Sequence, residues 1–186
     1  MRGGLRILGI DPGSGATGFG LVARVQGELC HVAHGVLRTP ASASLPLRLA
    51  HLHRAVQEVV ACHHPDVAVV EEVFVAASAR SALVLGQARG AVLAALAGAG
   101  VTVQEYAPAR IKQALTGSGR AGKQQIRALV QRLLALSALP GPDSADALAA
   151  AICHARSSRL ELLGVVPRAR RRRRAPGLRL AVRPAR

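Results

Sequence analysis

Short apolar runs alternate with segments of helical character in the middle of this chain of 186 residues. The run "VAVVEE" (67–72) is rich in β-branched residues and predicts a buried strand, and "VTVQEY" (101–106) predicts another. Residues 45–64 carry apolar side chains at the spacing of a helix, and the small and apolar residues of 78–98 predict a second helix. Strands that alternate with helices indicate a mixed α/β domain in which one sheet is covered on both faces.

The flanking regions complete this pattern. The N-terminal region predicts three antiparallel strands with a hairpin turn at Gln26-Gly27. The C-terminal region predicts three helices around a glycine-bearing loop. In chain order, the predicted strands are 5–11, 17–25, 29–38, 67–72 and 101–106, and the predicted helices are 45–64, 78–98, 108–115, 123–136 and 140–158. The predicted fold class is α/β, with a five-stranded mixed sheet flanked by helices.

The first predicted strand ends on a charge. In "LRILGIDPGSGATGFG" (5–20), an apolar run leads directly to Asp11 and then to a Pro-Gly-Ser-Gly turn. A charge at the end of an apolar strand costs several kcal/mol unless it is paired. Asp11 therefore helps to bind a nucleotide's phosphates, binds a metal ion or only forms part of a turn. Sugar kinases and actin-like ATPases share this opening, but the second phosphate hairpin and the length that they need are not visible here.

Four of the ten acidic residues fall where they can converge. Asp11 and Glu71 each end a predicted strand, and Asp143 and Asp146 lie three residues apart at the head of the last predicted helix, so both point to one face. If the two strands are neighbours, the four carboxylates meet at one sheet edge, where they repel one another unless cations are bound. Oxygen ligands select Mg²⁺ or Mn²⁺, and two such ions about 3.5–4 Å apart favour phosphodiester hydrolysis.

Each acid also has a purely structural interpretation. Asp11 suits a turn, and Asp143 and Asp146 suit the first turn of a helix, which favours acids. One of Glu71 and Glu72 must face away from the other, because strand side chains alternate, and we expect that residue to be solvated. The joint placement of the four acids favours the metal site.

Five segments, "LGIDPGSGATGFG", "VVEEVF", "SALVLGQARGAV", "IKQALTGSGRAGKQQI" and "DSADALAAAICH", occur in this order between residue 5 and about residue 157. Together they resemble the RuvC family of bacterial Holliday-junction resolvases. The resemblance implies a ribonuclease H-like fold, a homodimer that works with the RuvA–RuvB branch-migration complex, and paired incisions across a four-way DNA junction. It also implies two Mg²⁺ ions in each active site, with Mn²⁺ as a substitute.

The same resemblance assigns roles to individual residues. The family's catalytic, metal-binding acids fall on Asp11, Glu71, Asp143 and Asp146, its aromatic residue falls on Phe74, and its two functional lysines fall on Lys112 and Lys123. A protein that binds junctions without cutting them would lack one or more of these acids, whereas all four are present here.

The basic and aromatic residues support these assignments. Lys112 and Lys123 are the only lysines among the 25 Lys and Arg residues, which suggests that a compact ammonium is needed there rather than an ordinary surface charge. Lys123 could contact the scissile phosphate and Lys112 a flanking one. Phe74 either stacks on an unpaired base or packs in the core. Arg80 and Arg89 are candidate phosphate contacts.

The formal net charge of +15 is concentrated at the C-terminus. Residues 168–186 contain nine arginines and no acid, so they contact nucleic acid, dock on a protein partner or are simply solvated. We expect a nuclease domain at 1–160 and an Arg-rich, disordered tail at 161–186. No signal peptide or membrane span is predicted, and the location is expected to be cytoplasmic.

The segment 79–98 could also pair two copies of the chain. Small residues (Ala82, Gly86, Ala88, Gly90 and Ala94) would let another helix approach closely, and we expect Ala88 and Ala95 at a two-fold interface. The alternative is that this helix simply packs on its own sheet. The three cysteines, Cys30, Cys62 and Cys153, are predicted to be reduced and buried.

Overall fold

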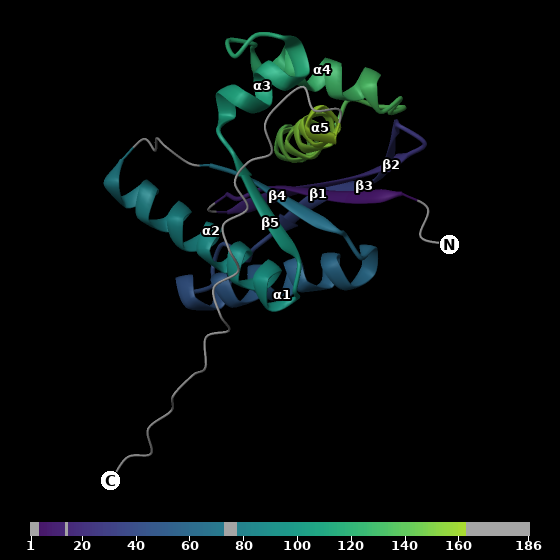
Figure 1. Cartoon of the computed structure of the whole chain (residues 1–186). Helices are drawn as coiled ribbons and strands as arrows, with labels where there is room; N and C mark the ends of the chain where they lie inside the picture. Colours follow the sequence, from purple (N-terminus) through teal and green to yellow (C-terminus); the bar gives the residue numbers. More distant parts are fainter. Residues whose placement is uncertain (1–3, 14, 73–77, 163–186) are drawn as a thin grey trace.

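The structure is a computed structural model that describes residues 4–13, 15–72 and 78–162. Every predicted strand and helix is present, in the predicted order (Figure 1). The strands are β1 (Leu5–Asp11), β2 (Ala16–Val25), β3 (Glu28–Arg38), β4 (Val67–Glu71) and β5 (Thr102–Tyr106), and the helices are α1 (Leu45–His63), α2 (Ala79–Gly98), α3 (Pro108–Thr116), α4 (Lys123–Leu133) and α5 (Pro142–Leu162). The predicted tail at 161–186 lies almost wholly outside the described residues.

Two turns show how local chemistry sets the element boundaries. Gln26 and Gly27 have φ angles of 51° and 92°, as a two-residue hairpin turn with two positive φ angles requires. α4 ends at Leu133 rather than at the predicted residue 136. Ala135 has a φ of 49°, and a residue in this left-handed conformation cannot continue a right-handed helix.

The sheet is mixed and has the strand order β3-β2-β1-β4-β5. β1 is antiparallel to β2, and β2 is antiparallel to β3. β4 is parallel to both β1 and β5. The predicted five-stranded mixed sheet is therefore confirmed, and so is the neighbouring placement of the first and fourth strands.

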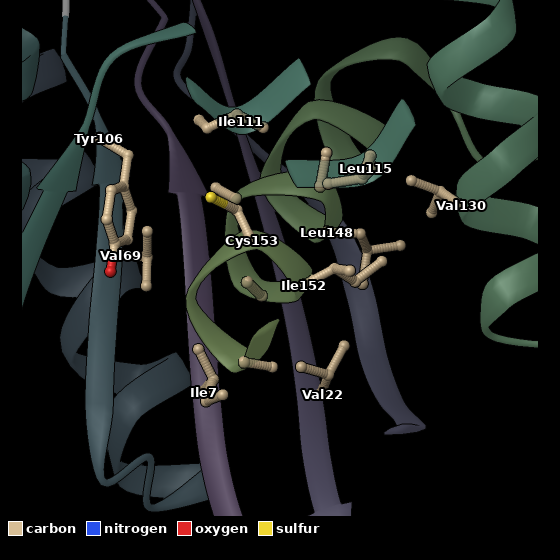
Figure 2. Packing of buried hydrophobic residues seen from close by; sticks show 14 of the residues in the cluster. Ile7, Val22, Val69, Tyr106, Ile111, Leu115, Val130, Leu148, Ile152 and Cys153 are labelled. Atoms are coloured by element: carbon tan, nitrogen blue, oxygen red, sulfur yellow. The ribbon is translucent and has the colours of Figure 1, made fainter. Parts of the chain in front are cut away.

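Helices cover both faces of the sheet (Figure 1). α1 and α2 pack on one face, where Leu8 belongs to a buried cluster with Val92. α3, α4 and α5 cover the other face, where Ile7 belongs to a second cluster with Ile152 (Figure 2). Adjacent strand residues such as Ile7 and Leu8 point to opposite faces, so one apolar strand contributes to both cores.

α5 lies directly on the sheet because the strands beneath it carry glycines. A Cβ atom at Gly9 would overlap the carbonyl oxygen of Ala147, and one at Gly18 would overlap the carbonyl oxygen of Asp143. Both neighbours are backbone atoms of α5, which cannot move aside as a flexible side chain can. The close approach of α5 to β1 and β2 therefore depends on these glycines.

α2 buries Ala88, Val92, Ala95 and Leu96 against the sheet. The prediction that Ala88 and Ala95 lie at an interface between two copies is wrong, because both side chains are in the core. The opposite face of α2 carries Leu83, which is 64% exposed.

Other features of the surface also differ from expectation. Cys153 is buried as predicted, but Cys30 and Cys62 are exposed, because they lie on the outer sides of β3 and α1. Among the described helices, α2 alone is long and apolar enough to cross a membrane by length and composition. It covers the sheet here, and its Arg89 forms an ion pair with Glu105 of β5.

Candidate active site

Asp11 and Glu71 are brought together by the parallel pairing of β1 and β4. Ile10 pairs with Val70 in this ladder, and each carboxylate belongs to the next residue along its strand. The apolar residues before them are fully buried and hold both strands in register. The sheet therefore delivers two acids side by side at one edge, as the sequence predicted.

α5 brings the other two acids to the same edge. Its first turn begins at Gly141, whose carbonyl oxygen accepts hydrogen bonds from the N–H of Ala145 and the hydroxyl of Ser144. The backbone of Asp143 lies against Gly18, which pairs with Asp11 across β1 and β2. Asp146 follows one turn later on α5.

An open cleft of about 400 Å³ lies at this edge of the sheet. Of the four predicted acids, Asp11, Glu71 and Asp146 line it, whereas Asp143 does not. The full set of lining residues is Asp11, Pro12, Glu71, Glu72, Leu85, Pro108, Ile111, Lys112, Lys123, Ile126, Asp146 and Ala149. Residues from six elements and their connections thus share one cleft, whose lining combines apolar and charged side chains.

Both lysines of the chain line this cleft. Lys123 is the first residue of α4, and its Nζ lies 4.0 Å from Oδ2 of Asp146. The Lys123 side chain is 81% exposed, so it is accessible to a large substrate. Lys112 is half-buried on α3.

Burial and mutual repulsion shift the pKa values of the acids in one direction. Burial, followed by the negative charges of Glu71, Asp146 and Asp143, raises the pKa of Asp11 from 3.8 to about 7, and the charge of Lys123 partly opposes this. Burial also raises the pKa values of Glu71 and Asp146. Lys112 and Lys123 lower the pKa values of these two acids. The site thus holds carboxylates that need a nearby cation in order to ionise fully.

The donor set fits hard divalent cations, because only carboxylate oxygens are offered. In the described part of the chain, no three His, Cys, Asp or Glu side chains form a group that could hold a metal ion in their present positions. Carboxylates that are not neutralised repel one another, so a looser arrangement is expected before cations bind. We therefore expect the side chains of Asp11, Glu71 and Asp146 to rotate slightly when metal ions bind at the site that we consider below.

The remaining predicted residues either do not line the cleft or lie outside the described residues. Phe74 falls within residues 73–77, outside the described residues. Arg80 is exposed in the first turn of α2. Arg89, a candidate phosphate contact, instead pairs with Glu105. His154 of α5 has its Nδ1 2.9 Å from the hydroxyl of Tyr106.

Sequence reasoning missed the place of Glu72 in the cleft. This residue was expected to be solvated, but it is half-buried and lines the cleft together with Leu85 of α2. Strand alternation does turn Glu72 away from Glu71. The cleft, however, crosses the end of β4, so that side chains from both faces of the strand border it. Only the position of α2 reveals this.

Comparisons with known proteins agree with this architecture. The family model described as "Crossover junction endodeoxyribonuclease RuvC" matches residues 7–154. A protein of that name from Alkalilimnicola ehrlichii is 54% identical over 149 residues, which cover 80% of this chain and 90% of that protein.

Solved structures extend this likeness to three dimensions. The Thermus thermophilus RuvC structure has a TM-score of 0.77 and 36% identity, covering 84% of this chain and 96% of that one. The same protein in complex with a Holliday junction substrate gives a TM-score of 0.75 and 34% identity, with the same coverage. These likenesses confirm the predicted ribonuclease H-like fold. By sequence over most of its length and by the fold that presents its acids, this chain belongs to the RuvC family of crossover junction endodeoxyribonucleases.

Proposed function

We propose that this protein resolves Holliday junctions, by paired metal-dependent hydrolysis of phosphodiester bonds in DNA recombination and repair. The observation that carries the proposal is the convergence of Asp11, Glu71 and Asp146 with Lys112 and Lys123 in one open cleft. Clusters of buried carboxylates with raised pKa values are typical of catalytic sites. The related Thermus thermophilus RuvC has been solved in complex with a Holliday junction substrate.

In this proposal, Asp11, Glu71, Asp143 and Asp146 hold two Mg²⁺ ions, for which Mn²⁺ can substitute. The bound ions would supply an activated water and offset the negative charge of the reacting phosphate. Asp11, the most strongly shifted acid, must release its proton before it can act as a ligand. Asp143, at the head of α5 but outside the lining of the cleft, completes the proposed set.

The lysines act on the DNA in this proposal. Lys123, exposed beside Asp146, stabilises the charge that develops on the scissile phosphate. Lys112 and Arg80 contact flanking phosphates. From its place in the sequence, Phe74 stacks on an unpaired base at the centre of the junction, a contact worth about 1–3 kcal/mol.

Paired cuts in opposite strands call for two active sites related by a two-fold axis, and we therefore propose a homodimer. The face of α2 that points away from the sheet is a candidate for the interface. It carries the exposed Leu83 and two glycines, Gly86 and Gly90, at which added Cβ atoms would meet no neighbour. Residues 1–160 form the nuclease domain, the arginines of residues 168–186 bind DNA phosphates, and the protein works in the cytoplasm with the RuvA–RuvB complex.

Cleavage of a synthetic four-way junction tests the activity. Full-length protein should cut the junction in the presence of Mg²⁺ or Mn²⁺, and should leave a linear duplex of the same sequence intact. EDTA should stop the reaction without preventing binding to the junction. Equal cleavage of the junction and the duplex would contradict structure-selective resolution.

A further inference from the structure

Arg127 of α4 holds the segment that leads into α5. Its Nε and Nη2 atoms both donate to the carbonyl oxygen of Pro140, at 3.1 Å and 2.9 Å. Pro140 is buried, and the next residue, Gly141, accepts the first hydrogen bonds of α5. One guanidinium thus holds the chain immediately before the helix that carries Asp143 and Asp146.

This contact has little support from other hydrogen bonds. Leu136 donates its N–H to Gln131, but among the described residues the hydrogen bonds that reach residues 137–140 come from Arg127. Before this segment, Ala135 has a φ of 49°, so α4 cannot continue into it as a regular helix. Two donors in a rigid fork restrict the position of Pro140 more than a single donor would.

The same helix presents a catalytic lysine to α5. Lys123 and Arg127 are four residues apart on α4, so they lie on the same face, one turn from each other. Lys123 approaches Asp146, and Arg127 holds Pro140. Besides their apolar packing, α4 and the N-terminal part of α5 are therefore connected by two polar contacts, of which only the Arg127 contact is a close hydrogen bond.

We propose that Arg127 is a positioning residue, which sets the first turn of α5 so that Asp143 and Asp146 meet the metal-binding acids of the sheet and Lys123. This inference rests on the proposed metal-dependent function. The charge of Arg127 acts in the opposite sense on metal binding, because a cation near the site repels metal ions. Arg127 also lowers the pKa of Asp146, so the comparison is made at a pH at which Asp146 is ionised with or without Arg127. Charge alone predicts that loss of Arg127 tightens metal binding, whereas positioning predicts that it weakens metal binding.

The test measures Mn²⁺ binding to the DNA-free, full-length protein by titration calorimetry. Arg127→Met keeps much of the side-chain volume and removes both the charge and the two hydrogen bonds. We expect its Mn²⁺ affinity to fall by about tenfold, which is typical for loss of a residue that orients metal ligands. Arg127→Lys keeps the charge but not the fork of donors, so its affinity should lie between those of Arg127→Met and the wild type.

Single-turnover cleavage provides a second readout. At saturating junction, Arg127→Met should cut about 10- to 100-fold more slowly, because small displacements of catalytic groups are costly. Its dissociation constant for the junction in EDTA should stay within about twofold of the wild-type value, since one lost charge contributes little to so basic a surface. Arg132→Met is the matched control, because Arg132 is exposed on the same helix beside the groove between α3 and α4.

Unchanged or tighter Mn²⁺ binding by a folded Arg127→Met variant would overturn the inference. Circular dichroism shows whether Arg127→Met folds. If it does not fold, Mn²⁺ binding by Arg127→Lys provides the test instead. Wild-type Mn²⁺ affinity in Arg127→Lys would then overturn the inference. Failure of the proposed function looks different, because the wild-type protein itself would then neither bind Mn²⁺ nor cut the junction.

Discussion

Gly18 of β2 lies directly against the backbone carbonyl of Asp143 in the first turn of α5. Because Gly18 is also the partner of Asp11 in the β1–β2 ladder, this contact sets how closely the acids of α5 approach those of the sheet. The absence of a side chain at this strand position, as at Gly9, thus lets the acids of α5 approach those of the sheet.

Gly18→Ala should therefore push α5 away from the sheet. Overpacking of this kind costs about 1–3 kcal/mol of unfolding free energy, and cleavage should fall more steeply than stability because the acids separate. Thermal melts and junction cleavage measure the two effects. Gly98→Ala is the control, since a Cβ atom there meets nothing. Normal cleavage by Gly18→Ala would show that the approach of α5 is not critical.

Substitution of single acids should separate cleavage from binding. Asp11→Asn, Glu71→Gln and Asp146→Asn should each reduce cleavage by more than about 100-fold, because direct ligands matter more than the residues that orient them. Asp143→Asn should have a smaller effect, since Asp143 does not line the cleft. Mobility shifts in EDTA should show junction binding like that of the wild type. A variant that keeps normal cleavage would remove its residue from the ligand set.

The pKa of Asp11 makes the stability of the metal-free protein depend on pH. Because folding raises this pKa from 3.8 to about 7, the folded state binds more protons than the unfolded state between these values. Stability should therefore be highest below this window, fall as the pH rises through it, and reach its lower level above about pH 7.

Asp11→Asn tests this dependence. In EDTA at pH 8, the variant should melt at least about 3 °C above the wild type, and the difference should shrink towards pH 5. Mg²⁺ should stabilise the wild type at pH 8 and have much less effect on the variant. Differential scanning calorimetry provides the measurement. Equal melting temperatures at pH 8 would mean that folding does not raise the pKa of Asp11.

Two positions on α2 separate the proposed interface from the core. Gly90→Arg places a charge on the outer face, where a Cβ atom meets no neighbour, so the protein should fold as a monomer that does not make paired cuts. Ala88→Arg places the charge in the core and should prevent folding. Sedimentation velocity distinguishes these outcomes. A Gly90→Arg variant that remains dimeric would place the interface elsewhere.

Removal of the arginine-rich end should weaken DNA binding without changing selectivity. Each phosphate contact contributes about −0.9 to the slope of log K against log salt on duplex DNA, and such contacts carry no preference for a site. Truncation after Gly164 should flatten this slope for junction and duplex alike, while junction-selective cleavage persists. Identical slopes for the truncated and full-length proteins would instead favour a protein partner or simple solvation.

Local patterns in the sequence were sufficient for the elements and for most of the candidate site. Apolar strands that end in Asp11 and Glu71, and a helix that begins near Asp143, place acids by chain geometry alone, because parallel neighbours end at the same edge. The hairpin turn at Gln26-Gly27 was equally local, since it depends on the conformational preferences of two residues. The metal ligands themselves stay a prediction.

Only the tertiary structure decided which side of α2 is buried, how closely α5 approaches the sheet, and what borders the cleft. α2 carries small and apolar residues around its whole circumference, so periodicity could not distinguish Ala88 from Gly90. The contacts of Gly18 with Asp143, of Glu72 with the cleft, and of Arg127 with Pro140 join residues far apart in the chain or separated by an irregular loop. Such contacts arise when packed layers meet, and no local preference of the residues encodes them.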